Sequence, residues 1–427
     1  MPTTRSRVIA VTILTAATCF LALSARASSG WTRLAFVEAI FEGDGGVVAG
    51  LDYGTAIAVS PDGEHLYVTS HNDASVAAFS RDIATGKLTF VEIEKNGVGF
   101  TDGLAGAKDV TISPDGSHVY VAGEIDNTVA VFSRHATTGA LTWLGVESDG
   151  VGIVYGLQSP TAVALSPDGK SLYVSCWDSQ TVATFARSLT NGMLLFLGVM
   201  EDGEGGVDGL AGASGVEVSP DGKHVYVAGY SESKIAEFSR NLTTGQLDFL
   251  GVVEDGVGFV DGVGGVVTVA VSPDGDHLYA TGFSEAAVAS FTRNPSTGRL
   301  SFIEVIRDGD GDVEGLDEPA EVAVSPDGKH VYVAAIEDDT VTAFARDDAT
   351  GRLTFLDAAT DGVGGIDGLA ETRYVAVSPD NRHVYALGRA EDALAAFLLS
   401  SVGFFKADPP ATELASGWPL APGFVSY

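Results

Sequence analysis

The chain has 427 residues, 45% of them hydrophobic, which is enough for two or three ordinary domains or for one long repeat array. Its formal net charge is −33, so it lacks the basic surface with which proteins bind nucleic acids or anionic membranes. This charge is compatible with a cation-binding or secreted protein, and equally with simple solubility.

The N-terminal residues predict a secretory signal peptide over residues 1–27. Two arginines precede an apolar run from Val8 to Leu23, and residues 25–27 have the small-x-small form that a signal peptidase accepts. We expect cleavage before Ser28, and an uncleaved N-terminal anchor is the alternative. The apolar run is short for a membrane span, and no later segment is long enough. The sequence therefore predicts a secreted or periplasmic protein with no stable membrane span.

A Ser-Pro-Asp motif recurs seven times after the signal peptide, at intervals of 53 residues. Its serines are Ser60, Ser113, Ser166, Ser219, Ser272, Ser325 and Ser378. A phenylalanine recurs with the same period from Phe79 to Phe397, and an arginine follows two positions after each of the first six. A fixed period of this kind indicates one structural unit repeated along the chain. We therefore predict a single repeat domain over residues 28–400 and a C-terminal tail over residues 401–427.

Each repeat reads as four short strands separated by turns. In the second copy we expect strands over residues 110–113, 118–122, 128–133 and 141–146, and Pro114-Asp115-Gly116 has the residue types of a tight turn. A four-stranded sheet with two apolar faces must be covered on both sides, and radial stacking of seven sheets achieves this. The expected fold is an all-β, seven-bladed β-propeller.

The two ends of the repeat region predict how the ring closes. The seventh unit supplies three strands and lacks a normal fourth one, whereas residues 34–38 match residues 88–92, the fourth strand of the first unit. We therefore expect a 3+1 clasp, in which the N-terminal strand completes the last blade.

The Ser-Pro-Asp-Gly-x-His-x-Tyr-Val motif resembles the YVTN-type repeats and the seven-bladed lactonase-like propellers, the 6-phosphogluconolactonase-like family. The resemblance extends over residues 34–399. It implies a propeller fold, and it implies lactone hydrolysis as one candidate activity. Because the motif consists of a turn and two strands, it identifies the fold better than the activity.

Most histidines, and the one cysteine left after cleavage, are predicted to be structural. His65, His118, His224, His277, His330 and His383 share one repeat position beside the turn. His135 falls on the opposite face, which leaves His71 on the face where ligands are expected. Cys176 follows an apolar strand, so we expect a buried thiol and no disulfide.

Two repeat positions differ strongly between the units and are predicted to surround the mouth of the channel. Eleven residues after each serine stand His71, Glu124, Trp177, Tyr230, Phe283, Ile336 and Arg389. Four residues before each serine stand Ala56, Asp109, Ala162, Gly215, Thr268, Glu321 and Tyr374, with Lys108 and Arg373 beside them. Aromatic rings with acids and cations suit a sugar, a peptide or another small polar ligand. Ordinary sequence drift in surface loops is the alternative.

The predicted ligand-binding residues combine these two positions. They are His71, Glu124, Trp177, Tyr230, Phe283, Arg389, Lys108, Asp109 and Tyr374. His71 belongs to the first blade and Arg389 to the seventh, so ring closure should make them neighbours.

An acidic, glycine-rich loop between two repeats is a candidate calcium site. Asp308, Asp310, Asp312 and Glu314 stand at alternate positions, which lets a flexible backbone present several oxygen ligands to a hard cation. The loop departs from an EF-hand, because it lacks the glycine after the third acidic position and the glutamate at the twelfth. The alternative is that the aspartates cap the loop backbone.

Two functions are compatible with these features. The main prediction is a secreted, monomeric propeller that presents a binding face to a small polar ligand, a sugar, a peptide or a protein, with calcium as a possible stabilising ion. The alternative is a lactone hydrolase, for which the catalytic candidates are His71, Arg389, Arg373, Glu321 and Glu124. No Ser-His-Asp or metal-histidine spacing supports an enzyme directly.

Overall fold

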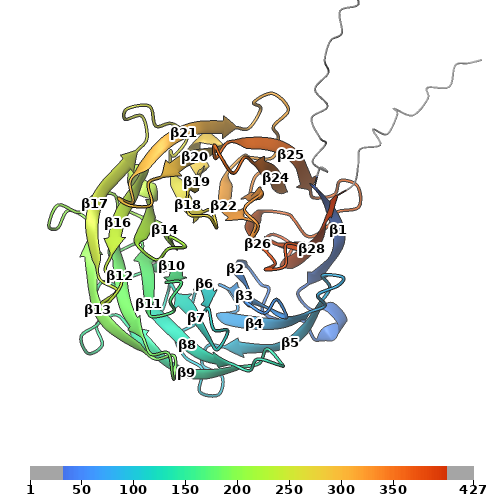
Figure 1. The fold of residues 1–427 in the computed structure, drawn as a ribbon. Helices are drawn as coiled ribbons and strands as arrows, with labels where there is room; N and C mark the ends of the chain where they lie inside the picture. Colours follow the sequence, from blue (N-terminus) through green and yellow to red (C-terminus); the bar gives the residue numbers. More distant parts are fainter. Residues whose placement is uncertain (1–31, 402–427) are drawn as a thin grey trace, which may run out of the picture. The chain divides into compact units, whose positions relative to one another are not determined.

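A computed structural model describes residues 32–401, which form seven four-stranded antiparallel sheets around a central channel (Figure 1). This arrangement confirms the predicted seven-bladed β-propeller. Three short 3-10 turns are also present: η1 (Asp44–Gly46), η2 (Tyr230–Glu232) and η3 (Phe283–Glu285). None of the helices in residues 32–401 has the length and apolar character needed to cross a membrane. The predicted signal peptide and residues 402–427 lie outside the described residues.

Each blade runs from an inner strand beside the channel to an outer strand at the rim (Figure 1). The inner strands are β2 (Gly54–Val59), β6 (Ala107–Ile112), β10 (Pro160–Leu165), β14 (Ala213–Val218), β18 (Val266–Val271), β22 (Pro319–Val324) and β26 (Thr372–Val377). The second strands are β3 (His65–Ser70), β7 (His118–Gly123), β11 (Ser171–Cys176), β15 (His224–Gly229), β19 (His277–Gly282), β23 (His330–Ala335) and β27 (His383–Gly388).

The third strands are β4 (Ser75–Arg81), β8 (Thr128–Arg134), β12 (Thr181–Arg187), β16 (Lys234–Arg240), β20 (Ala287–Arg293), β24 (Thr340–Arg346) and β28 (Ala393–Ser401). The outer strands are β5 (Leu88–Lys95), β9 (Leu141–Ser148), β13 (Leu194–Glu201), β17 (Leu247–Glu254), β21 (Leu300–Arg307), β25 (Leu353–Thr360) and β1 (Thr32–Phe41). The strands are slightly longer than the sequence pattern predicts, because the ladders continue into the turns.

The last blade is built from both ends of the described chain. Its strand order is β1-β28-β27-β26, and β1 pairs antiparallel with β28 so that Thr32 lies opposite Ser401. Strand β1 occupies the outer position that β5 or β9 fills in the blades that follow it.

The hydrophobic core lies between the blades. One of its clusters contains Tyr120 and Val129 of the second blade together with Val174 and Phe185 of the third, and all four side chains are fully buried. Burying one large apolar side chain contributes about 1.5–3 kcal/mol, so each interface holds its two blades together strongly. Cys176 lies in this cluster as a free thiol, and it is buried, as predicted.

The repeated arginine at the end of the third strand joins each blade to the preceding one. Arg134 donates from Nε to the Tyr67 hydroxyl at 2.9 Å and from Nη2 to Asp62 at 2.7 Å. Its Nη1 also donates to the Gly116 carbonyl oxygen of its own blade at 3.0 Å. Six blades make this arginine clamp, through Arg81, Arg134, Arg187, Arg240, Arg293 and Arg346. Because Arg81 reaches Tyr385, one clamp closes the ring between the first and last blades.

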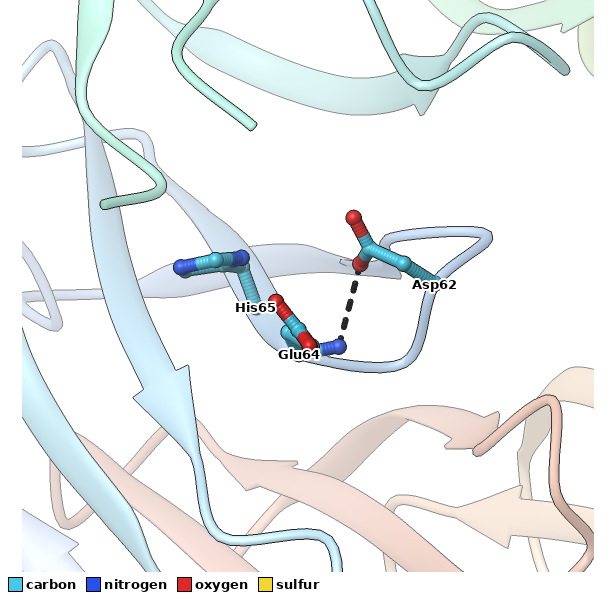
Figure 2. A group of neighbouring side chains, drawn as sticks. All are labelled: Asp62, Glu64 and His65. Atoms are coloured by element: carbon cyan, nitrogen blue, oxygen red, sulfur yellow. Dashed lines mark hydrogen bonds between the residues drawn. The ribbon is translucent and has the colours of Figure 1, made fainter. Parts of the chain in front are cut away.

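The repeated histidine completes the clamp. His65 Nδ1 accepts a hydrogen bond from Arg134 at 2.7 Å, and burial together with the Arg134 charge lowers the histidine pKa. Its ring lies against Gly139 of the next blade, where a Cβ atom would come within 2.1 Å of the ring. Figure 2 shows His65 with Asp62 and Glu64, a combination that could suggest a metal site. Because Asp62 and His65 are both engaged by Arg134, this group is structural.

The interface between the sixth and seventh blades has no such arginine among the described residues. Leu399 occupies the position in β28, and its backbone N–H donates to Arg382 at 2.8 Å as Arg81 N–H donates to Glu64 at 2.7 Å. The buried Tyr332 hydroxyl, which this arginine would reach, has no hydrogen-bond partner in the described part of the chain. An unpartnered buried hydroxyl costs free energy, so this interface is weaker in polar contacts than the other six.

We expect the Leu399→Arg substitution to stabilise the protein by about 1–3 kcal/mol, because a guanidinium there would bind Tyr332 and Asp327. Chemical denaturation measures the free energy of unfolding. Leu399→Met is the size-matched control and should gain nothing. The gain should also shrink in a Tyr332→Phe background, and an equal gain there would contradict the clamp explanation.

Candidate active site

The channel contains a cavity of about 760 Å³ on the face where the long loops from the outer strands return to the inner strands. A cavity of this volume is in the range that holds small-molecule ligands. Its polar lining includes Lys108, Asp109, Glu124, Glu217, Glu321, Arg373 and Tyr374. Strands β6, β14, β22 and β26 supply six of these side chains, so rigid sheet positions them.

The structure brings seven of the nine predicted ligand-binding residues to the cavity. They are Lys108, Asp109, Glu124, Trp177, Tyr230, Phe283 and Tyr374. Of the five catalytic candidates, Glu124, Glu321 and Arg373 line it.

The remaining two predicted residues, His71 and Arg389, lie beside the cavity and are linked to each other. His71 Nε2 is 3.8 Å from Glu124 Oε2. Arg389 lies over the ring of Tyr53 at 4.5 Å, and the Tyr53 ring is 5.6 Å from the His71 ring. Ring closure therefore brings the two together through Tyr53, and Glu124 connects His71 to the cavity.

The cavity cations replace a residue that has a structural role in other blades. At the position five before the motif serine, Thr55 and Thr161 each donate from Oγ1 to a carbonyl oxygen of the next inner strand at 2.7 Å. Lys108 and Arg373 occupy this same position in the second and seventh blades. These blades give up a bond between inner strands and gain a positive charge at the cavity, which indicates a functional role.

Arg373 is the cavity cation that is most available to a ligand. Lys108 Nζ lies 3.1 Å from Glu124 Oε2, and burial lowers the lysine pKa although the Glu124 charge opposes the change. Outside the cavity, Arg389 is paired with Glu371 at 2.6 Å. The Arg373 side chain makes no hydrogen bond or ion pair to any other residue within 32–401. Its guanidinium can therefore bind an oxygen of a substrate.

Three carboxyl groups in the cavity have raised pKa values. Burial raises the pKa of Asp109 to about 7, although the backbone N–H groups of Val163 and Val110 donate to it. Burial and the Asp109 charge raise the pKa of Glu217 to about 8, and they raise that of Glu321 well above its usual range. Near neutral pH, Asp109 is partly ionised, whereas Glu217 is mainly protonated. Groups that titrate near the working pH are suited to proton transfer.

Glu217 is a cavity acid that the sequence analysis missed. It lies two positions before the motif serine, where the other repeats have Ala58, Thr111, Ala164, Ala270, Ala323 and Ala376. Its signal in the sequence was a carboxylate at a repeat position that otherwise holds small residues. Because residues two apart in a strand share a face, Glu217 lies on the same channel face as Gly215, which stands four residues before the motif serine.

Three aromatic side chains form an arc along one wall of the cavity. Trp177 and Tyr230 have ring centroids 5.4 Å apart, and Tyr230 and Phe283 have centroids 6.1 Å apart. Because they come from three consecutive blades, the arc lies on one side of the channel. The side chains are half-buried and therefore available to a ligand.

The predicted calcium loop does not gather its carboxylates. Asp308, Asp310, Asp312 and Glu314 are all exposed. Asp308 Oδ1 accepts from the Leu316 N–H at 3.2 Å, and Asp310 Oδ2 accepts from the Arg307 N–H at 3.0 Å. The clusters of converging ligand atoms found within the described residues do not include this loop. Calcium binding here stays a prediction.

Comparison with known proteins identifies the family. The family model "Lactonase, 7-bladed beta-propeller" matches residues 32–154, 102–204, 163–257 and 265–363, and the chain belongs to this family. A 6-phosphogluconolactonase of Klebsiella pneumoniae (strain 342) is 22% identical over 286 residues, which cover 66% of this chain and 76% of that protein.

Two solved structures share the fold. The periplasmic gluconolactonase of Pseudomonas aeruginosa superposes with a TM-score of 0.59 at 22% identity, covering 78% of this chain and 96% of that one. The hydrazine synthase of Kuenenia stuttgartiensis gives a TM-score of 0.61 at 18% identity, covering 83% and 97%. Their different names illustrate that the fold alone does not determine the reaction.

These relatives correct the main functional prediction. The main prediction was a protein that presents a binding face, whereas the lactonase family and its 6-phosphogluconolactonase members favour the alternative, a lactone hydrolase. The prediction was wrong because it relied on the lack of a local Ser-His-Asp or metal-histidine spacing, whereas the residues that line the channel come from different blades and are far apart in the sequence.

Proposed function

We propose that this protein hydrolyses a lactone in the channel cavity. The observation that carries the proposal is the meeting, in one cavity, of the unpaired Arg373 with a carboxyl group, Asp109, whose pKa is about 7. Membership of the lactonase family supports the reaction class. The predicted signal peptide supports a reaction in the periplasm or outside the cell.

The cavity groups supply what ester hydrolysis requires. Ionised Asp109 accepts a proton from a water molecule as the water oxygen attacks the lactone carbonyl carbon. The carbonyl oxygen becomes an oxyanion, which the Arg373 guanidinium stabilises. When the ring C–O bond breaks, Asp109 returns the proton to the leaving oxygen. The product is a hydroxy acid, which ionises and releases one proton to the solution.

Glu217 contributes by remaining neutral. Because burial raises its pKa to about 8, it adds little negative charge beside the developing oxyanion near neutral pH, and burial disfavours the charged form of Glu321 in the same way. A neutral carboxyl group here can donate a hydrogen bond to a substrate oxygen.

Acid release from gluconolactone, measured by titration at constant pH with the protein from residue 28 onward, tests the proposal. We expect catalysed release above the spontaneous rate, and we expect the Arg373→Ala variant to lower kcat/KM by about 10²–10³-fold. Asp348→Asn, in an exposed turn between β24 and β25 on the opposite face, is the control and should retain full activity. Absence of hydrolysis with gluconolactone and with substituted lactones would reject the function.

A further inference from the structure

The cavity has two chemically different sides. The second and seventh blades supply its charged side, with Lys108, Glu124 and Arg373. The third, fourth and fifth blades supply the aromatic arc of Trp177, Tyr230 and Phe283. Since blades follow the chain order around the ring, these two sides face one another across the channel (Figure 1). A ligand that fills the cavity touches both.

The charged side is poorly suited to a phosphate group. Glu124 already pairs with Lys108, so a phosphate dianion would find one unpaired cation, Arg373, in the cavity. The carboxyl groups of Asp109, Glu217 and Glu321 line the same space. The negative charge of a phosphate group on the substrate would make it still harder to ionise Asp109, because like charges in a buried site disfavour each other.

The aromatic arc provides a large apolar surface that a lactone ring alone would not cover. Three neighbouring rings bind planar or aliphatic groups through dispersion and edge-to-face contacts. In addition, the cavity volume of about 760 Å³ exceeds the needs of one six-membered ring and leaves room for a substituent on the arc.

We propose that the substrate is an unphosphorylated lactone with an aromatic or alkyl substituent, oriented with its carbonyl group at Arg373 and its substituent on Trp177, Tyr230 and Phe283. This inference rests on the proposed hydrolysis and adds the substrate class. It separates this chain from relatives whose names specify a phosphorylated sugar lactone.

Steady-state kinetics with three lactones tests the inference. The probes are dihydrocoumarin, which has a fused benzene ring, gluconolactone and 6-phosphogluconolactone. We expect kcat/KM to be at least about tenfold higher for dihydrocoumarin than for gluconolactone, and lowest for the phosphorylated lactone. Hydrolysis with a preference for 6-phosphogluconolactone would overturn the inference and leave the proposed function intact.

Variants of the arc give a second readout. Tyr230 is the middle ring, and Tyr230→Ala should lower kcat/KM for dihydrocoumarin about tenfold and that for gluconolactone by a clearly smaller factor. Phe259→Ala is the matched control, because Phe259 is 93% exposed and outside the cavity lining, and it should change neither value. An equal loss with both lactones would contradict a role in recognising the substituent.

A binding measurement decides the inference even if no lactone is hydrolysed. Trp177 in the arc should report binding through its fluorescence. We expect 2-hydroxyphenylpropionate, the ring-opened form of dihydrocoumarin, to change the emission at concentrations where gluconate has no effect, and we expect the Tyr230→Ala variant to bind it more weakly. Equal responses to the two acids would overturn the inference.

Discussion

The Asp109→Asn substitution should lower kcat/KM for the hydrolysed lactone by about 10²–10⁴-fold, the usual contribution of a positioned general base. Asparagine has nearly the same shape, but its amide cannot accept a proton from water. The substitution also replaces one of the two oxygens that accept from Val110 and Val163, so the thermal midpoint must be measured beside the rate. A large loss of activity with a folded, cooperative melt is the expected result.

The pH dependence gives this prediction its sharpest form. Because burial raises the Asp109 pKa to about 7, the ionised base disappears as the pH falls through that value, and kcat/KM should fall with it. Above pH about 7 the profile should become flat until another group titrates. Asp109→Asn should abolish this step, and Asp348→Asn should leave it unchanged. A step near pH 7 that survives in Asp109→Asn would assign the base to another group and contradict the proposed role of Asp109.

The Arg293→Met substitution should destabilise the propeller by about 2–4 kcal/mol, a large part of the stability of an ordinary domain. The Arg293 side chain is fully buried and donates to the Tyr226 hydroxyl at 3.0 Å, to the Gly275 carbonyl oxygen at 2.7 Å and to Asp221 at 2.8 Å. Methionine fills much of the volume but leaves these acceptors without their donor. Denaturant unfolding monitored by circular dichroism measures the loss.

An exposed arginine serves as the control for this substitution. Arg352 pairs with Glu304, but its side chain is 60% exposed, so Arg352→Met should cost less than about 1 kcal/mol. Equal losses in the two variants would show that the clamp contributes no more than a surface ion pair.

The acid range gives a second check on the clamp. Burial acts to raise the Asp221 pKa, but hydrogen bonds from Ser219 and Arg293 outweigh it and lower this pKa to about 2. A carboxyl group with a lowered folded pKa contributes stability above its unfolded pKa, and this stability is lost as the pH falls from about 4 to about 2. Arg293→Met should weaken that dependence.

The fold could be predicted from the sequence because the repeat spacing, the turn residues and the apolar faces of the strands all indicated the same architecture. The spacing of Ser60 and Ser113 gave the length of the unit, and the turn residues gave the strand boundaries to within a few positions. Radial stacking then followed from two apolar faces. The clamps could not be foreseen, because Arg134 finds Tyr67 and Asp62 in the preceding blade, and a periodic arginine alone does not name its partners.

The candidate site could be located from the sequence only in part. Positions that vary between repeats identified Asp109, Arg373 and the aromatic arc, since packing fixes the rest of each blade. Glu217 was not predicted, because it stands at the second channel-facing position of the inner strand, where most repeats have alanine. The pKa values depend on burial and on neighbours from other blades, and Arg389 proved to be engaged by Glu371 and Tyr53. Contacts such as that between Arg389 and Tyr53 form when the ring of blades closes, and no short sequence motif marks them.

The pairing of β1 with β28 also determines how the molecule responds to tension. Because Thr32 lies opposite Ser401, the two ends of the described chain lie side by side at one end of the β1–β28 pair. A force that pulls these two ends apart acts first on the nearest hydrogen bonds between β1 and β28, and it then breaks the following hydrogen bonds of the pair one after another. Mechanical unfolding should therefore begin in the last blade at low force.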